Sequence, residues 1–309
     1  MKIWFLGTGA GRPGKHRNVT GIALQLPDPS CHWWLFDAGE ATQHQLLRTP
    51  LKLSKLEAVF VTHLHGDHLY GLPGLLSSRS FDGGITPLRL FGPPGLKHYV
   101  DTVFGISGTQ LDYELHIHEL TAPEGEIWDN GTVRIEAGAL EHRIACYGYR
   151  VTEREQPGKL LVHKLEELGL TAGPLYGKLK QGQSVALEDG TLIRSEDVTG
   201  EAKPGRVVTI LGDTKPCANV VKLAKGADLL VHEATFARGM EEKAHEFGHS
   251  TTAEAAEAAA AAGAKRLVMT HFSGRYGSED LIRLEAEAAE RFKPVTAAVD
   301  LMMLEVNRE

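Results

Sequence analysis

The sequence predicts a layered α/β fold, in which two packed β-sheets are flanked by helices within one large domain of residues 1–309. Three observations support this expectation. Both halves of the chain alternate short apolar strands with amphipathic helices, a pattern typical of sheets covered by helices. A polar loop rich in histidine leaves the buried strand 59–61. Between residues 152 and 203 the alternation stops, which indicates an inserted, flexible arm that is not part of the core.

The first half of the chain is read in order from its apolar runs and its turn residues. A strand at 3–6 ends at the Gly-Thr-Gly turn 7–9, and a Pro-rich turn separates the next two strands. Pro73 falls near the first turn of a helix, where its missing N–H costs nothing. An acidic turn is expected between the last two strands. The expected strands are 20–26, 33–37, 88–91, 115–120 and 132–140, and the expected helices are 41–47, 72–80 and 95–104.

The second half resumes the alternation after the inserted segment. A strand at 145–151 precedes the segment, which contains a short helix at 163–168, a turn at 173–177 and a hairpin around Asp189-Gly190. The alanine-rich run 253–262 favours a helix, and Thr251-Thr252 offers its N-cap. The expected strands are 206–211, 228–232, 266–270 and 296–304, and the expected helices are 217–225, 251–262 and 278–291.

Composition narrows the class of protein. The net charge of −7 argues mildly against a polyanionic partner, although bound divalent cations would offset acidic ligands that are included in this count. No apolar run approaches the ~20 residues of a membrane span, and no signal peptide is recognised, so no membrane association is expected. Three widely spaced cysteines indicate reduced thiols, and we therefore expect a cytoplasmic protein.

Strong metal ligands cluster directly after strand 59–61. The segment Thr62-His63-Leu64-His65-Gly66-Asp67-His68 carries three histidines and one aspartate. Residues two apart in an extended segment point the same way, so His63 and His65 can hold one ion together. Gly66 allows the loop to turn, and Asp67 and His68 then face a second ion. The helical His-Glu-x-x-His spacing is absent. His116 and His118 repeat the His-x-His spacing without a following Asp-His, so we interpret them as a solvated strand face.

This segment resembles the signature of the metallo-β-lactamase superfamily. The resemblance implies a four-layer αββα sandwich with two metal ions at one edge, and it leaves the substrate open. Later strand ends carry matching ligands at His142, Asp213 and His271. A carboxylate has two oxygens to share, so Asp213 is expected to bridge the ions. The predicted sets are His63, His65, His142 and Asp213 for one ion, and Asp67, His68, Asp213 and His271 for the other.

Further stretches resemble one branch of the superfamily, the short-form tRNA 3′-processing endoribonucleases called ribonuclease Z or ribonuclease BN. These are Pro13-x-Lys15-x-Arg17-Asn18, His232-Glu233-Ala234-Thr235, Gly248-His249-Ser250-Thr251, and the 152–203 insertion with Gly173-Pro174. The resemblance covers nearly the whole chain. It implies that Lys15, Arg17 and Asn18 sense the tRNA 3′ end, and that the insertion is an exosite for precursor tRNA. It also implies a homodimer.

The expected activity is endonucleolytic removal of the 3′ trailer from precursor tRNA, leaving a 3′-hydroxyl on the tRNA and a 5′-phosphate on the trailer. Two Zn²⁺ per subunit are expected, and the same ligands also suit Mn²⁺ or Co²⁺. Asp67 would accept a proton from the attacking water, and His249, oriented by Glu233, would protonate the leaving oxygen. In the insertion, Lys178 and Lys180 join Gly173 and Pro174 as expected substrate contacts.

Two alternatives share these residues. A metallohydrolase of small molecules, such as a lactonase, thioesterase or phosphodiesterase, needs the same metal ligands but gives no role to the insertion or to the loop 13–18. A non-enzymatic RNA-binding scaffold with a structural metal is the second, and the intact ligand set, including Asp67, argues against it. A precursor tRNA with a 3′ trailer, tested against thioesters and lactones, would separate these functions.

Overall fold

Apolar strands of the first half of the chain form one mixed sheet in the computed structural model, which describes residues 1–27, 31–155, 158–187 and 189–308. Within these residues, seven strands pair in the order β18-β1-β3-β4-β5-β6-β7. β4 to β7 run parallel, whereas β1 pairs antiparallel with both β3 and β18. The strands are β1 (Lys2–Gly7), β3 (Gly21–Gln25), β4 (Trp33–Phe36), β5 (Leu56–Phe60), β6 (Leu88–Gly92), β7 (Leu115–Glu119) and β18 (Met303–Glu305).

The second half of the chain supplies most of a second sheet. Its order across the described residues is β17-β15-β14-β13-β10-β9-β8, and β13, β14, β15 and β17 are parallel. Its strands are β8 (Glu124–Asp129), β9 (Val133–Leu140), β10 (Cys146–Glu153), β13 (Val207–Ile210), β14 (Leu229–Glu233), β15 (Leu267–Thr270) and β17 (Val295–Ala297). A short parallel pair, β2 (Gly9–Ala10) and β16 (Phe272–Ser273), lies beside the two sheets.

Aromatic side chains fill the space between the two sheets. Phe36 and Phe60 of the first sheet stack on each other and both contact Tyr149 of the second. The Tyr149 hydroxyl donates to the Val61 carbonyl at 2.6 Å, so this buried polar group is satisfied. Such dense packing fixes the two sheets against each other. The strand ends of both sheets are thereby held at fixed positions.

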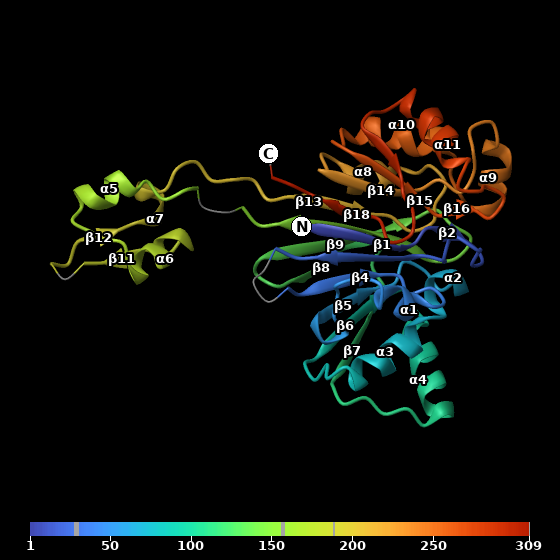
Figure 1. Cartoon of the computed structure of the whole chain (residues 1–309), viewed down its shortest axis with the longest axis horizontal. Coiled ribbons are helices and arrows are strands. Elements are labelled where there is room, and N and C mark those ends of the chain that lie inside the picture. The colour runs from blue at the N-terminus through green and yellow to red at the C-terminus, as the bar shows by residue number, and fades with distance from the viewer. Residues whose placement is uncertain (28–30, 156–157, 188, 309) are drawn as a thin grey trace. The chain divides into compact units, whose positions relative to one another are not determined.

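Helices cover the outer faces of both sheets (Figure 1). On the first sheet, leucines of the helices pack against buried strand residues, and these helices are α1 (Thr42–Leu46), α3 (Leu72–Phe81) and α4 (Leu96–Ser107). On the second sheet the covering residues are mostly alanine and leucine, and the helices are α8 (Ala218–Ala224), α10 (Thr252–Ala262) and α11 (Leu281–Ala289). The resulting helix-sheet-sheet-helix order confirms the predicted fold. Shorter elements of this unit are η1 (Leu53–Lys55), α2 (Gly66–Leu69) and α9 (Glu241–Phe247).

Most of the insertion forms a separate compact unit. This unit comprises Asp129–Arg134, Thr152–Arg206 and Arg308, whereas the two sheets and their helices form the other unit. Leucine, valine and isoleucine side chains give it a small core of its own, made of Leu165, Leu170, Leu179, Val185, Ile193 and Val198. Its elements are α5 (Val162–Glu167), α6 (Pro174–Lys180), α7 (Ser195–Val198) and the antiparallel pair β11 (Val185–Ala186) and β12 (Leu192–Ile193). This pair confirms the predicted hairpin.

Several local predictions were wrong. The expected strand 296–304 is two strands, β17 and β18, which lie in different sheets and are separated by a turn containing Leu301 at φ 64°. The expected acidic turn after β7 contains β8, an edge strand whose charged side chains point to solvent. The expected turn at 173–177 is largely the helix α6, which begins at Pro174. The metal loop ends in the helix α2, where Gly66 is the first residue.

No helix within the described residues has both the length and the apolar character needed to cross a membrane.

Candidate active site

The predicted metal ligands sit at the ends of strands from both sheets. In the first sheet, β5 leads directly into His63 and His65, and Asp67 and His68 follow on α2. In the second sheet, β9 precedes His142, β13 precedes Asp213 and β15 precedes His271. Because the packed sheets fix these strand ends, side chains that are far apart in sequence meet at one edge.

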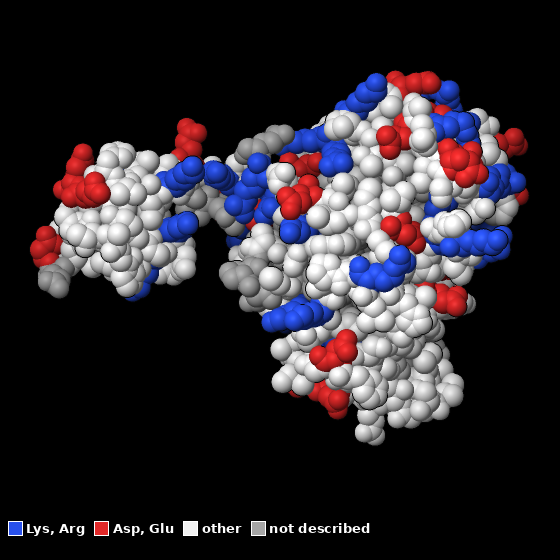
Figure 2. Space-filling model, viewed as in Figure 1, with Lys and Arg blue, Asp and Glu red and all other residues white. Residues whose placement is uncertain are grey.

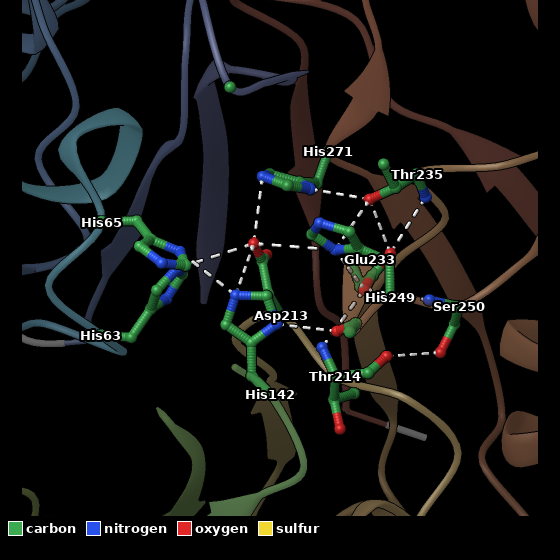
Figure 3. Close-up of polar contacts among 12 residues, drawn as sticks. His63, His65, His142, Asp213, Thr214, Glu233, Thr235, His249, Ser250 and His271 are labelled. Carbon is green, nitrogen blue, oxygen red and sulfur yellow. Dashed lines mark hydrogen bonds and ion pairs between the residues drawn. The ribbon is translucent and has the colours of Figure 1, made fainter. Parts of the chain in front are cut away.

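Asp213 lies at the centre of this group (Figure 3). Its carboxylate is almost fully buried, and one oxygen, Oδ2, faces ring nitrogens of several histidines. The distances from Oδ2 to Nε2 are 3.4 Å for His271, 3.5 Å for His68, 3.6 Å for His63 and 4.0 Å for His142. Burial opposes the charge of Asp213, but the surrounding imidazoles, His271 first, hold its pKa well below the usual value. An ionised carboxylate in this position is suited to bridge two cations.

The donor atoms of the described residues fall into five groups, three of which contain only predicted ligands. One group is His63, His65 and His142, where His142 Nε2 lies 3.2 Å from His65 Nδ1. Another is Asp67, His68 and His271, and a third joins His63 and His68 to Asp213. Within each group the ligand atoms lie within 4.8 Å of one another. The structure therefore brings together every residue predicted to bind metal.

The chemistry of these side chains fits a divalent cation. His63 Nε2 is buried and has no hydrogen-bond partner among the described residues. A buried nitrogen without a partner costs free energy of folding, unless its lone pair binds a metal ion. Burial lowers the pKa of His63, His65 and His142, so these rings favour the neutral form that binds metal. Nitrogen and carboxylate donors of this kind suit zinc and similar ions.

Asp37 and Thr62 orient two of the ligands, and sequence reasoning did not assign them this role. Asp37 Oδ2 lies 2.7 Å from His68 Nδ1 and also accepts from the Thr62 hydroxyl at 2.8 Å. The Thr62 hydroxyl in turn lies 3.0 Å from His63 Nδ1. Burial opposes the charge of His68, but the carboxylates of Asp213 and Asp37 raise the pKa of this ring above the usual value. Asp37 has φ 60°, an uncommon conformation for this residue, and such strain is typical of functional sites.

Two further predicted histidine ligands, His142 and His271, are oriented in the same way. His142 Nδ1 lies 2.7 Å from the Gly248 carbonyl, and His271 Nδ1 lies 2.8 Å from the Thr235 hydroxyl. That hydroxyl donates to Glu233 Oε2 at 2.7 Å. Partners of this kind fix the ring orientation and leave Nε2 free for a metal. A threonine after a strand gave no signal of this role in the sequence.

His249 contacts Glu233 and belongs to two further groups of donor atoms, one with His142 and Asp213 and one with Glu233 and His271. Its Nδ1 is 3.0 Å from Glu233 Oε1 and 3.8 Å from Asp213 Oδ2. Glu233 is buried and also accepts from the backbone N–H groups of Thr214 and Ser250. Burial disfavours the charged imidazole, but the adjacent Glu233 carboxylate outweighs this effect and raises the pKa of His249 to about 9. His249 is therefore suited to carry a proton at neutral pH.

Asp67 is held by the turn that follows β2. Its Oδ2 accepts from the Gly11 N–H at 2.6 Å and lies 3.3 Å from His271 Nε2. Burial opposes ionisation of Asp67, but the contact with His271 and the nearby His68 lowers its pKa below the usual value. The first turn of the chain thus supports the metal loop.

The loop 12–18 lies next to the site, and its residues have different roles in the structure. Lys15 is exposed. Arg17 is half-buried, donates to the Tyr276 carbonyl at 3.2 Å and lies over the Phe272 ring. Asn18 donates from its side chain to the Glu40 carbonyl at 2.9 Å. Arg17 and Asn18 therefore also hold the loop in place, whereas Lys15 projects into solvent.

Gly173, Pro174, Lys178 and Lys180 lie in the other compact unit, around α6. Both lysines are exposed. His116 and His118 belong to none of the metal-competent groups found among the described residues. His118 instead stacks on Phe91, in agreement with the predicted strand face.

The two packed sheets and the His/Asp cluster at their edge define a metal-dependent hydrolase of the metallo-β-lactamase fold. Residues 179–272 match the family model described as Beta-lactamase superfamily domain, and residues 1–109 match the model described as Anti-Pycsar protein Apyc1. The crystal structure of human tRNase Z, short form, superposes with a TM-score of 0.73 at 30% identity, covering 99% of this chain and 100% of that one.

Curated relatives extend over the whole chain. Ribonuclease Z of Geobacillus kaustophilus is 49% identical over 308 residues, covering 100% of both chains. Ribonuclease Z of Limosilactobacillus fermentum is 48% identical over 306 residues, covering 99% of this chain and 98% of the relative. The chain belongs to the ribonuclease Z family, which confirms the resemblance and the enzyme class predicted from the sequence.

Proposed function

We propose that this enzyme is a metal-dependent endoribonuclease that removes the 3′ trailer from precursor tRNA in the cytoplasm. The main observation in support is the His249–Glu233 pair, which lies next to the His/Asp donor set in a chain with full-length similarity to ribonuclease Z. The products would be a tRNA with a 3′-hydroxyl and a trailer with a 5′-phosphate. The small number and wide spacing of the cysteines, Cys31, Cys146 and Cys217, support a reducing compartment.

Two Zn²⁺ per subunit are proposed for the donor set. His63, His65, His142 and Asp213 would hold one, and Asp67, His68, Asp213 and His271 the other. When bound, such ions lower the pKa of water and offset charge on a phosphodiester. The buried carboxylate of Asp213 faces both groups of histidines, so it ties the two positions together. Asp67, fixed by the Gly11 N–H, is proposed to accept the proton of the attacking water and to aim it.

His249 is proposed as the proton donor to the leaving group. Hydrolysis breaks the bond between phosphorus and the ribose O3′, and the leaving oxygen needs a proton because an alkoxide leaves poorly. Glu233 holds Nδ1 of His249, so Nε2 is the atom that would deliver the proton to O3′. The oxygen of water stays on the trailer phosphate. A protonated imidazole with a pKa of about 9 is available for this step at neutral pH.

The unit formed by the insertion is proposed to bind a part of precursor tRNA other than the cleaved bond. It has its own small core, and α6 exposes Lys178 and Lys180 next to Gly173 and Pro174. Two exposed lysines on one short helix suit contacts with backbone phosphates. Lys15, Arg17 and Asn18 are proposed to contact the 3′ end, with Lys15 as the exposed cation of this loop.

A homodimer is also proposed. The described surface of the first helical layer carries large exposed apolar side chains, including Phe81, Ile85 and Ile106. The surface over α4 is largely uncharged in Figure 2. Exposed apolar groups of this size are typical of an interface between subunits. Sedimentation of a variant with Phe81→Glu and Ile106→Glu is expected to show a monomer where the parent protein is a dimer. A parent protein that is monomeric at micromolar concentration would contradict the proposed homodimer.

The test of the function is cleavage of a precursor tRNA that carries a 3′ trailer, with thioesters and lactones as competing substrate classes. We expect a single cut that leaves a 3′-hydroxyl on the tRNA, and slow turnover of the esters. The small-molecule alternative uses the same metal ligands but has no use for an RNA-binding unit. Efficient hydrolysis of an ester together with no cleavage of the precursor would replace the proposed function with that alternative.

A further inference from the structure

A polar cavity lies between the loop 12–18 and α1. Its volume is about 420 Å³. The charged and titratable side chains of its lining are Lys15, His16, Arg17, His44, Arg48 and Asp300. Lys15, Arg17 and Arg48 thus outnumber the carboxylate of Asp300 in this lining, on a chain whose net charge is negative. Such a hollow is suited to an anion.

Helix α1 and the turn that follows it supply two of the lining side chains. His44 lies in α1 and Arg48 lies in the turn after the helix, and both line the cavity. Both are exposed, and Arg48 Nη1 donates to the neutral side-chain oxygen of Gln45 at 3.2 Å. Across the described ranges, no ion pair involves Lys15, His44 or Arg48. The donor groups of these side chains are therefore available to a ligand.

The carboxylate of Asp300, the acidic residue of the lining, is held by neutral donors rather than by Lys15 or Arg48. Asp300 Oδ1 accepts from the Thr8 N–H at 3.0 Å and from the Thr8 hydroxyl at 2.8 Å. Its Oδ2 accepts from the Asn18 N–H at 2.6 Å and from the Gln45 side chain at 3.0 Å. Neutral donors thus occupy both carboxylate oxygens, and they fix the loop 12–18 and α1 on either side of the cavity.

The segment that precedes the cavity-lining residues of α1 lies against the metal loop. The Ala38 N–H donates to the His68 carbonyl at 2.8 Å. Gly39 approaches so closely that an added Cβ would lie 2.3 Å from the Asp67 carbonyl oxygen. Ala41, two residues further along the chain, is part of the cavity lining, so chain connectivity links the cavity to the loop that carries Asp67 and His68.

We propose that this cavity is a phosphate subsite in which His44 of α1, Arg48 of the turn after α1, and Lys15 bind a backbone phosphate of the RNA substrate near the cleaved bond. The inference rests on the proposed function, because it assumes that the substrate is RNA. Arginine is well suited to this role, since its guanidinium offers several donors in a fixed plane. The phosphate belongs either to the trailer or to the tRNA side of the cleaved bond.

The test compares Arg48→Gln and His44→Ala with Lys55→Gln, which removes an exposed cation of the neighbouring η1 outside the cavity. The Kd for precursor tRNA is measured across a salt series, together with turnover of a small chromogenic phosphodiester. Arg48→Gln should raise the Kd roughly threefold to tenfold and reduce the slope of log Kd against log salt by about 1, as expected for one lost phosphate contact. Lys55→Gln should change neither quantity, and the small diester should be turned over normally by all variants.

Precursors with a trailer of one nucleotide identify the phosphate. If the effect of Arg48→Gln persists on this substrate, the phosphate lies on the tRNA side; if it disappears, the phosphate lies in the trailer. Equal Kd values and salt slopes for Arg48→Gln and Lys55→Gln would overturn the subsite while leaving the proposed function intact, provided that the parent enzyme cleaves the precursor. Failure of the parent enzyme to bind or cleave precursor tRNA would instead overturn the proposed function.

Discussion

Glu233 Oε1 lies 3.0 Å from Nδ1 of His249, and the same carboxylate reaches a metal-ligand histidine through one hydroxyl. The hydroxyl belongs to Thr235, which donates to Glu233 Oε2 and lies 2.8 Å from His271 Nδ1. One buried acid therefore orients both the proposed proton donor and a proposed metal ligand. Loss of Glu233 should affect both functions, whereas loss of His249 should affect proton transfer alone.

Replacing His249 by alanine is expected to slow cleavage of precursor tRNA by ~10²–10⁴-fold, the usual size of a general-acid effect. Metal content and precursor binding should be unchanged, because His249 is not among the predicted ligands. A nitrophenyl phosphodiester, whose leaving group needs no proton, should lose much less activity. Steady-state rates on both substrates provide the measurement. Equal losses on the two substrates would show that His249 is not the proton donor.

Replacing Asp213 by alanine removes the carboxylate that faces both histidine groups. The variant should bind less metal and lose turnover on every substrate, because the remaining ligands cannot hold two ions together. Elemental analysis of the dialysed protein gives the metal content. His116→Ala is the matched control, since this exposed histidine lies outside the metal-competent groups and should leave metal content and rate unchanged. An Asp213→Ala protein with full metal content and a normal rate would contradict the assignment.

Glu153 predicts a pH dependence of stability. Burial opposes its charge, but hydrogen bonds from Arg206 and Arg308 outweigh this effect and lower its pKa to about 2. A lowered pKa means that the carboxylate stabilises the fold above its unfolded-state value of 4.5, and that this contribution is lost as the pH falls toward 2. In metal-free protein, the midpoint of thermal unfolding should fall over this range.

Glu153→Gln is the matching variant. It should unfold at a lower temperature than the parent protein at pH 7. Its free energy of unfolding should be lower by roughly 1–3 kcal/mol, the cost of leaving a buried partner unsatisfied. The difference from the parent protein should shrink as the pH falls from 4.5 toward 2. A difference that stays constant across this interval would mean that the ion pair does not set the acid sensitivity.

Excising the insertion unit is expected to separate RNA binding from chemistry. The ends of the excision are close together, because Leu160 pairs with Thr199 and the Gly200 N–H donates to the Lys159 carbonyl at 2.8 Å. Residues 161–198 can therefore be replaced by a short Gly-Ser turn. The shortened enzyme should keep its metals and its activity on a small phosphodiester, bind precursor tRNA far more weakly and show a shallower salt dependence. Unchanged tRNA processing would remove the exosite role, and loss of both activities in a folded protein would mean that the unit shapes the active site.

Two basic residues of the loop 12–18, Lys15 and Arg17, are expected to have different effects when each is replaced by alanine. Lys15→Ala should change cleavage of a precursor that contains CCA more than cleavage of one that lacks it, without a change in thermal stability, because Lys15 is exposed. Arg17→Ala should also lower the unfolding temperature, because it removes the contacts with Tyr276 and Phe272. Equal effects of Lys15→Ala on both precursors would mean that Lys15 contributes only its positive charge and does not recognise the CCA sequence.

The His and Asp side chains that the structure brings together could be predicted to meet, because they follow strongly apolar strands at fixed positions, and because His and Asp in this spacing have few other uses. Asp37, Thr62 and Thr235 could not be predicted in the same way. Their roles depend on which histidine lies opposite them after the two sheets pack, and a threonine or aspartate after a strand is common in any loop.

The errors in secondary structure have similar causes. Periodicity treats 296–304 as one strand, but the chain there leaves the second sheet and joins the first, and Asp300 is held in the crossing by Thr8 and Asn18. The strand β8 is rich in glutamate because it is the edge strand of its sheet, where charged side chains remain in water. Neither fact can be read from local sequence, since both depend on partners that are distant along the chain.

The pairing of β1 with β18 has a consequence for synthesis on the ribosome. β1 is made first, and its outer neighbour, residues 303–305, is made almost 300 residues later. Until that segment leaves the exit tunnel, one side of β1 presents unpaired N–H and C=O groups to the cell. The first sheet can form early from β1 to β7, but its open edge is closed only when translation of this segment is complete. Slow elongation through the second half of the message would lengthen this exposure and increase aggregation of the nascent chain.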